Sequence, residues 1–416
     1  MNAPSPHPFH TQDLLLLAPC LPRPDGGAHS LRWFHMLRYL ARHYRVHLGC
    51  VADPARDGSH FGRVRALCHE TFFVAPPGLR QRVRGGAADA ALAGWAARLC
   101  ARQPVAAVLA AGARLGAGLA DLPQGPVRAV DLVELESDQR RRHGASRRWP
   151  STVLWRRQAR QLLAIERAAG AACGHVLFAT AADVARFRLF APESAHKAQH
   201  LASGVDADYY SPHILHRSPY RPGLRPLVLA GAMDERVNVE AAQWFAHDVF
   251  APLRAEHPSL VLYLVGARPD GRVRALARQQ GVTVTGSVAD ARAYLSHAAL
   301  VLAPPGGSHV GALQVMTAMA LQKPVLAAPR TIASLACPHV PEAYVASDAA
   351  AFRERIAALL GLADGGAQGD AAAGRDPLAV GRAARARVLR EHDWQLRLAG
   401  LPALLGKRDH EAASVG

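Results

Sequence analysis

The chain has 416 residues, which is too long for a single hydrophobic core and fits two domains of about 200 residues each. Half of the residues are hydrophobic (50%), so global disorder is excluded and a sizeable interior can be buried. The formal net charge of +16 invites a nucleic-acid interpretation, but no stacking platform or recognition-helix pattern accompanies it. Because 46 of the 49 basic residues are arginine, the charge partly reflects composition bias; a basic surface for an anionic bilayer or a diphosphate-bearing ligand is the other interpretation.

The first half of the chain alternates strand and helix patterns. An apolar strand pattern at 13–20 is followed by a glycine-containing loop at 21–30, a helical pattern at 31–44 and a second strand pattern at 45–52. This order is typical of the opening unit of a doubly wound α/β domain. Further strands are expected at 70–77, 106–112, 127–137 and 175–180, and further helices at 91–102, 153–172 and 181–191.

The second half repeats this alternation. Strands are expected at 226–233, 260–269, 282–288, 299–305 and 324–329, and helices at 238–258, 271–280, 291–298, 309–322, 348–363 and 380–405. Steps of this regularity predict a second parallel sheet. The stretch 213–225 contains two prolines and a glycine and is the best linker candidate.

These patterns predict an α/β protein with two Rossmann-like, doubly wound parallel-sheet domains. The expected parts are a first domain at 13–212, the linker at 213–225, a second domain at 226–378, terminal helices at 379–405, and flexible tails at 1–12 and 406–416. Ligands of such domains meet the loops at the carboxyl ends of the strands, so we expect a ligand cleft between the two domains.

Metal and membrane signals are weak. The six cysteines are scattered without a C-x-x-C pair, and no histidine cluster has metal-ligand spacing, so we expect no metal site. No run approaches the roughly 18 apolar residues of a membrane span, and the segment before the apolar stretch 14–19 lacks the basic region of a signal peptide. We therefore expect a cytoplasmic protein.

Two glycines follow the first strand pattern. Gly26 and Gly27 let the backbone approach a ligand closely and lead into a helix N-terminus, where unpaired N–H groups favour an anion. The spacing is not that of G-x-G-x-x-G, and a tight structural turn is the alternative interpretation.

Carboxylates follow the strand pattern that begins at residue 127. Glu134, Glu136 and Asp138 alternate there, and alternation along a strand sends all three side chains to one face. Paired carboxylates can orient sugar hydroxyls or act as general bases. A solvated strand end explains the same residues equally well.

Glycine loops also end the first two strands of the second domain. Gly231 lies in "GAMDERVN" and Gly266 in "VGARPDG"; both suit close backbone approach, and Arg268 could meet a phosphate. An arginine on a surface turn is the alternative.

A third loop of the second domain opens a helix. Gly306, Gly307 and Ser308 precede the helical pattern, so backbone amides there can cradle a diphosphate without side-chain charge. His309 is the nearest candidate cation, and it is only partly protonated near neutral pH.

With these residues in view, the chain resembles the family 4-like GT-B glycosyltransferases, and more closely the sugar transferases associated with PEP-CTERM/exosortase exopolysaccharide loci. The resemblance covers 13–405 and is carried by "PDGGAHSLRWFHMLRYLARHYRVHLGCVADP", "VDLVELESDQ", "RRQARQLLAIERAAG", "GVDADYYSP", "GAMDERVNVEAAQWF", "VTVTGSVADARAYLSHAALVLAP" and "VMTAMALQKPVLA". It implies a GT-B fold whose C-terminal helix crosses back to the first domain.

The resemblance also implies an activity: transfer of a sugar from a nucleotide-diphosphate donor to a glycan or a polyprenyl-diphosphate-linked acceptor, with retention of configuration and without a metal or other cofactor. The second domain would bind the donor, and the acceptor would face the first domain near Gly26 and Gly27. The implied donor-binding residues are Gly231, Arg268, Gly306, Gly307, Ser308, Gln314 and Thr317, and the candidate catalytic residues are Glu134, Asp138 and His309.

The donor motif departs from the family pattern. Gln314 stands where relatives have a lysine, and Thr317 stands where they have the carboxylate that holds the donor ribose; His309 and Gln139 replace other basic residues. Each lost charged hydrogen-bond partner costs about 1.5–3 kcal/mol. Two functions therefore stay open, an active glycosyltransferase with altered donor preference and a catalytically degenerate GT-B scaffold that binds a glycan or a partner enzyme; an epimerase is a distant third.

One helical pattern suggests a membrane surface. Arg156, Arg157 and Arg160 lie near Trp155, a basic amphipathic arrangement that suits an anionic inner-membrane face. A solvated arginine face is the alternative.

Overall fold

The computed structural model describes residues 12–24, 26–76, 86–145, 151–305, 308–333, 335, 344–362 and 377–407. Contacts between residues divide the chain into two compact units, the first made of Met1–Ala202 and Leu398–Gly416 and the second of Ser203–Arg397. The predicted linker at 213–225 belongs to the second unit, and 213–224 contains neither helix nor strand. Each unit contains one parallel sheet, as predicted.

The first unit is built on a seven-stranded sheet in the order β3-β2-β1-β4-β5-β6-β7. Its strands are β1 (Asp13–Ala18), β2 (Arg45–Val51), β3 (Glu70–Val74), β4 (Val105–Ala111), β5 (Val127–Val133), β6 (His175–Phe178) and β7 (Ala198–His200). The strands pair in parallel, with Leu16 opposite Leu48 of β2 and Leu109 of β4. Both faces of the sheet are covered, which explains why β1 is a continuous apolar run with every residue buried.

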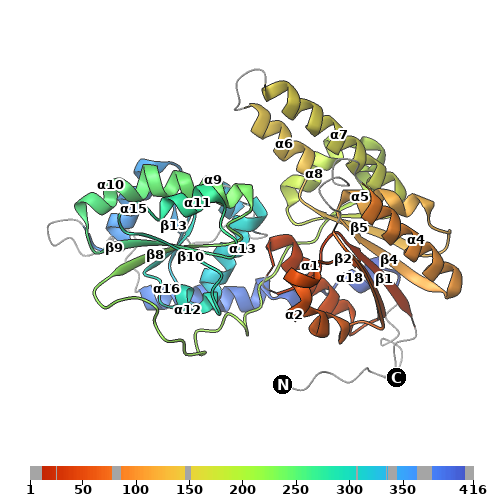
Figure 1. Ribbon diagram of the computed structural model, residues 1–416, viewed down its shortest axis with the longest axis horizontal. Helices are drawn as coiled ribbons and strands as arrows, with labels where there is room; N and C mark the ends of the chain where they lie inside the picture. Colours follow the sequence, from red (N-terminus) through yellow and green to blue (C-terminus); the bar gives the residue numbers. More distant parts are fainter. Residues whose placement is uncertain are drawn as a thin grey trace, which may run out of the picture. The chain divides into compact units, whose positions relative to one another are not determined.

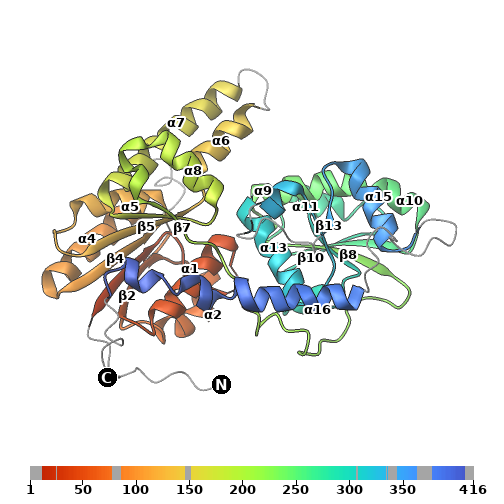
Figure 2. The ribbon, with the colours of Figure 1, turned by 180° about the vertical axis from the view of Figure 1, so that it is seen from behind.

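Helices cover both faces of this sheet. They are α1 (Ala28–Leu40), α2 (Pro54–Arg65), α4 (Ala87–Arg102), α5 (Ala113–Gly118), α6 (Glu136–Ala145), α7 (Ser151–Ala172) and α8 (Ala181–Phe190), with the 3-10 turns η1 (Leu119–Asp121) and η2 (Pro192–Lys197). Both views place α1 and α2 on one side of the sheet and α4 and α5 on the other (Figures 1 and 2). Helices α6 and α7 form a long pair that extends from the sheet (Figure 1).

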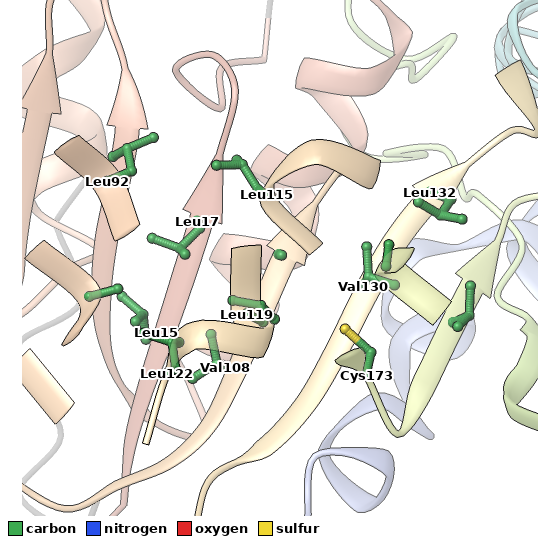
Figure 3. Close-up of a cluster of buried hydrophobic side chains, with 14 of the residues drawn as sticks. Leu15, Leu17, Leu92, Val108, Leu115, Leu119, Leu122, Val130, Leu132 and Cys173 are labelled. Atoms are coloured by element: carbon green, nitrogen blue, oxygen red, sulfur yellow. The ribbon is translucent and has the colours of Figure 1, made fainter. Parts of the chain in front are cut away.

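The main core of the first unit lies on the α4–α5 side. Leu15 and Leu17 of β1 point toward Leu115, Leu119 and other apolar side chains of the covering helices (Figure 3). These residues are at most 5% exposed, so the burial of this layer contributes to the stability of the unit.

The second unit has a six-stranded sheet in the order β10-β9-β8-β11-β12-β13. Its strands are β8 (Arg225–Ala230), β9 (Leu260–Val265), β10 (Val282–Gly286), β11 (Leu300–Ala303), β12 (Val325–Ala327) and β13 (Tyr344–Val345). Its helices are α9 (Arg236–Trp244), α10 (Ala251–Glu256), α11 (Gly271–Leu276), α12 (Ala291–Ser296), α13 (Ser308–Ala320), α14 (Pro329–Ala333), α15 (Ala349–Leu359) and α16 (Pro377–Arg387). A π-helical segment, η3 (Phe245–Phe250), joins α9 to α10.

The chain ends in short helices. The π segment η4 (Val388–His392) and α17 (Trp394–Leu398) lead to α18 (Leu401–Leu404). The hydroxyl of Tyr44 donates to the Pro402 carbonyl at 3.1 Å, and Leu401 is fully buried. The segment from Leu398 is therefore part of the first unit, which agrees with the predicted return of the C-terminal helix. Within the described part of the chain, no helix has both the length and the apolar character needed to span a bilayer.

Candidate functional site

The strand order reverses between β8 and β11 in the second sheet, so their carboxyl ends mark the switch point where ligands of such sheets bind. The predicted loop after β11 falls here, but Gly306 and Gly307 lie outside the described residues. Ser308 and His309 are the first two residues of α13. For these two residues only the helical backbone is described. The described site is therefore built from the loops after β8 and β9 and from α13.

Gly231 and Gly266 lie against one another at this edge. A Cβ atom added to Gly266 would lie 1.8 Å from the carbonyl oxygen of Gly231, far inside van der Waals contact. The amide of Gly231 donates to the Val265 carbonyl at 3.0 Å, and the amide of Asp270 donates to the Met233 carbonyl at 3.0 Å. The close approach seen here is between the two loops, so a close approach of a ligand to these glycines stays a prediction.

Arg268 lies in the loop after β9 and forms an ion pair with Asp234 of the loop after β8. Its Nε and Nη2 both lie 2.9 Å from Oδ2 of Asp234. The Arg268 side chain is 47% exposed and that of Asp234 is 39% exposed. Arg268 therefore reaches the predicted edge, and sequence analysis missed Asp234 as its partner.

Gln314 reaches the same edge from α13. Its side-chain Nε2 donates to the Ala230 carbonyl at the end of β8, at 2.7 Å. Thr317 lies one turn further along α13; both residues are half-buried, whereas 311–313, 315, 316 and 318–320 are buried. Gln314 and Thr317 thus share one side of the helix. Asn238 of α9 completes this edge by donating to the Ala232 carbonyl at 3.0 Å.

In the first unit, the predicted run of carboxylates is not a strand. β5 ends at Val133 and α6 begins at Glu136, so the expected placement of Glu134, Glu136 and Asp138 on one strand face is wrong. Leu135 is the only apolar residue in 134–138, which is too little to continue a buried strand. Glu134 and Leu135 form a loop instead, and Glu136 and Asp138 lie in the first turn of α6. Glu134 is 7% exposed and accepts a hydrogen bond from Gln139 at 2.5 Å.

Asp138 is held by three arginines. Its carboxylate lies 2.7 Å from Arg141, 3.0 Å from Arg142 and 3.2 Å from Arg186, and the residue is 1% exposed. This arrangement ties α6 to α8. The position of Asp138 suits anchoring of α6, whereas Glu134 lies in the loop at the end of the strand.

A buried carboxylate that sequence analysis missed supports the same turn. Glu166 of α7 is 2% exposed and accepts hydrogen bonds from the amide of Ser137 at 3.1 Å and from its hydroxyl at 2.5 Å. Burial raises the pKa of Glu166 to about 7, and the bonds from Ser137 oppose this rise. Glu166 thus binds the N-terminal turn of α6, where orphan amides favour an anion.

A second missed feature is a buried ion pair. Arg32 of α1 donates from Nε and Nη2 to the two oxygens of Asp131 in β5, both at 2.9 Å, and Trp33 donates to Oδ2 of Asp131 at 3.0 Å. Arg32 and Asp131 are fully buried. Two sequence signals could have predicted this pair: Asp131 lies inside an apolar strand, and Arg32 lies on the apolar side of a helix.

Gly26 and Gly27, which were predicted to face an acceptor, precede α1. Gly27 is its N-cap without a side-chain cap, and a Cβ atom at Gly26 would lie 2.5 Å from the Ser30 hydroxyl. That hydroxyl donates to the Leu21 carbonyl at 2.9 Å and accepts from the Arg23 amide at 3.2 Å. The packing of the turn against Ser30 therefore explains why glycine is needed at position 26. The predicted binding role is a separate explanation of the same glycine. Among the residues that the structure describes, no group of three or more His, Cys, Asp or Glu side chains could hold a metal ion.

Comparison with solved structures decides the fold. The chain is similar to WaaG, a glycosyltransferase involved in lipopolysaccharide biosynthesis, with a TM-score of 0.65, 14% identity, and 95% of this chain and 100% of that chain covered. The fold is GT-B. A glycosyltransferase from Rickettsia africae ESF-5 is also similar (TM-score 0.63, 11% identity, 96% and 100% covered).

A third GT-B structure is Anabaena Alr3699/HepE in complex with UDP and glucose, with a TM-score of 0.62, 14% identity, and 94% of this chain and 99% of that chain covered. Residues 225–361 match the protein family described as "Glycosyl transferases group 1". No curated protein matches the chain. In this GT-B protein the matched residues include β8, α13 and the loops that carry Gly231 and Arg268.

Proposed function

We propose that the protein is a glycosyltransferase that transfers a sugar from a nucleotide-diphosphate donor. One observation carries this proposal: Gly231, Gln314 and the Asp234–Arg268 pair meet at the carboxyl edge of the second sheet, within the part that matches a glycosyltransferase family. The Arg268 side chain is 47% exposed at this edge, and an arginine fork suits a diphosphate. The similar Anabaena protein has been crystallised with UDP and glucose, which supports a nucleotide-sugar ligand.

In this proposal the leaving diphosphate is stabilised by electrostatics rather than by covalent chemistry. The N-terminus of α13 supplies amides, and Arg268 supplies the cation. Glu134 is the candidate catalytic carboxylate of the first unit, and it lies in the loop directly after β5. The finer parts of the proposal are a hexosyl donor, retention of configuration, no added cofactor, and a role in exopolysaccharide biosynthesis of the PEP-CTERM type.

The test is binding followed by turnover. Calorimetry with UDP, GDP and dTDP and their sugars should give saturable binding to at least one nucleotide, and that donor should be hydrolysed or transferred. Arg268→Gln should reduce donor affinity by about tenfold, the loss of one charged hydrogen-bond partner. A protein that binds none of these nucleotides and hydrolyses none of these sugars is not this enzyme.

The second candidate is a degenerate GT-B scaffold that binds a glycan or a partner enzyme. Two residues favour it. The Gln314 amide is used on the Ala230 carbonyl, and Thr317 offers a hydroxyl where the family resemblance implies a carboxylate. The double variant Gln314→Lys/Thr317→Glu separates the candidates. Improved donor binding would indicate an eroded donor site, whereas no gain would favour a site rebuilt for another ligand.

We also propose that the α6–α7 pair attaches the enzyme to the anionic cytoplasmic face of a membrane, where a lipid-linked acceptor would be found. Val153 and Leu154 are each 58% exposed on α7, and Arg156, Arg157 and Arg160 are exposed on the same helix. Flotation with anionic vesicles should fail at high salt and in the triple variant Arg156→Gln/Arg157→Gln/Arg160→Gln. Binding that is equal with neutral vesicles would contradict this attachment.

A further inference from the structure

The Asp234–Arg268 pair combines a strained backbone with exposed side chains. Arg268 has a φ of 48°, in the left-handed region that non-glycine residues adopt only where their surroundings enforce it. Both side chains are nevertheless more than a third exposed, so the pair does not bury a charge or close a core. The fold thus fixes the place of an arginine whose head group stays accessible.

The backbone on both sides of Arg268 is locked. Gly266 lies against the Gly231 carbonyl without room for a Cβ atom, Pro269 follows directly, and the Asp270 amide is bonded to the Met233 carbonyl. Asp270 also caps α11 by accepting from the Arg272 amide at 2.8 Å. The side chain of Arg268 can therefore change its partner without any rearrangement of the loop.

We propose that Asp234 is an internal competitor for Arg268, which the diphosphate of an incoming nucleotide sugar must displace, so that Asp234 sets the affinity for the donor. This inference rests on the proposed function. An exposed ion pair is weak, whereas a diphosphate offers at least two negative charges and several oxygens in the geometry that a guanidinium prefers. The exchange keeps Arg268 paired throughout and exposes the Asp234 carboxylate to water.

The test compares Asp234→Asn with the unaltered protein by isothermal titration calorimetry, with UDP and with inorganic pyrophosphate as probes. Asn keeps the size of the side chain and removes its charge, so Arg268 loses its competitor. We expect affinity for both probes to rise about 2- to 5-fold, the factor that corresponds to the usual strength of an exposed pair. Arg268→Gln should weaken binding, and the double variant Asp234→Asn/Arg268→Gln should bind no better than Arg268→Gln alone.

A matched control excludes a general effect of charge. Glu193 pairs with Arg167 in the first unit at 2.7 Å, with side chains 41% and 51% exposed. Glu193→Gln changes the net charge by the same amount as Asp234→Asn, and it should leave both affinities unchanged.

The outcomes separate this inference from the proposed function. Equal or weaker binding by Asp234→Asn, a gain that persists without Arg268, or no binding of either probe by any variant would overturn the competitor role. If both affinities follow the expected pattern but no nucleotide sugar is turned over, Asp234 competes as proposed and the glycosyltransferase proposal fails.

Discussion

Val133, the last residue of β5, has a φ of 64°, a conformation rare for a β-branched residue. The amide of Glu134 donates to the Leu132 carbonyl at 2.7 Å across it, which makes a γ-turn. Such a turn costs on the order of 1–3 kcal/mol and persists only where its surroundings fix it. Asp131 on one side and Ser137 on the other are each anchored by buried partners, so Glu134 is held in one place.

The first anchor is the buried pair of Arg32 and Asp131. Asp131→Ala leaves the Arg32 guanidinium buried without its carboxylate and should destabilise the first unit by about 3–5 kcal/mol. The double variant Arg32→Met/Asp131→Leu should recover most of this loss, since it buries no charge. Urea denaturation followed by tryptophan fluorescence measures the free energy of unfolding of both variants. Equal losses of stability in the single and double variants would contradict this prediction. Glu193→Ala, which breaks an exposed pair, should leave the urea midpoint almost unchanged.

The second anchor is the bond between Ser137 and Glu166, and the Glu166 carboxyl changes its protonation with pH. Glu166 has a pKa of about 7 in the folded protein, above its ordinary value near 4.5, so its contribution to stability is fully present below pH 4.5 and is lost as the pH rises through 7. The free energy of unfolding should therefore fall between pH 5 and 7.5, by up to about 3 kcal/mol from this group. Glu166→Gln should flatten that part of the profile. Denaturant melts of both proteins at pH 5 and pH 7.5 give the difference; parallel profiles would show that Glu166 does not titrate in this window.

At this scale the sequence predicted loops better than partners. Gly231, Arg268 and Gln314 reach one edge of the second sheet because glycines and turn residues mark strand ends locally. Asp234, Arg32 and Glu166 were missed as partners because their contacts join residues 34, 99 and 29 positions apart. Such pairings depend on the strand order, which a single sequence does not state.

At the scale of elements, strands covered on both faces were predicted closely. β1 and β11 are short apolar runs that each end directly before a proline, Pro19 or Pro304, and every residue of both strands is buried. The end of β5 was misread because polar residues at alternate positions suit a strand edge and a first helical turn equally. The helices around β8 and β9 were correctly placed, but the contact between the two following loops is a tertiary feature.

That contact allows an element-scale prediction. Gly266→Ala places a methyl group 1.8 Å from the Gly231 carbonyl, so one of the two loops must move. We expect a loss of about 1–3 kcal/mol in the second unit and weaker nucleotide binding. Gly271→Ala is the control, because its nearest contact is 3.9 Å away and lies at the end of the Arg274 side chain. Thermal melts measure the stability of the two variants, and calorimetry measures their nucleotide affinity. Equal stability and equal affinity of Gly266→Ala and Gly271→Ala would contradict the prediction.

At the scale of the whole molecule, composition and pattern predicted two α/β domains, and each unit indeed contains its own parallel sheet. The chain enters the second unit at Ser203 and returns to the first at Leu398. The return rests on a few apolar residues near the C-terminal end, which resemble any short amphipathic helix in sequence. Their destination was implied by the family resemblance rather than by composition or periodicity, and the contact of Tyr44 with Pro402 and the burial of Leu401 agree with it.

This return predicts that a substitution late in the sequence weakens the first unit. Leu401 is fully buried in α18, and Leu401→Ala should cost about 2–5 kcal/mol there. Hydrogen exchange should accelerate in β1 and α1 while β8 and β9 keep their protection. Leu396→Ala changes a residue that is 54% exposed and should leave both patterns intact. Faster hydrogen exchange in the second unit alone would show that α18 does not pack in the first unit.

The same return sets an order of events during synthesis. The nascent chain contains every strand of the first sheet by residue 200, but the Tyr44 hydroxyl has its partner at the carbonyl of Pro402. The ribosome must translate all of the second unit before the first can be completed. The second unit, whose residues form one uninterrupted stretch, can mature first, so the half of the protein made earlier is the half that finishes folding last.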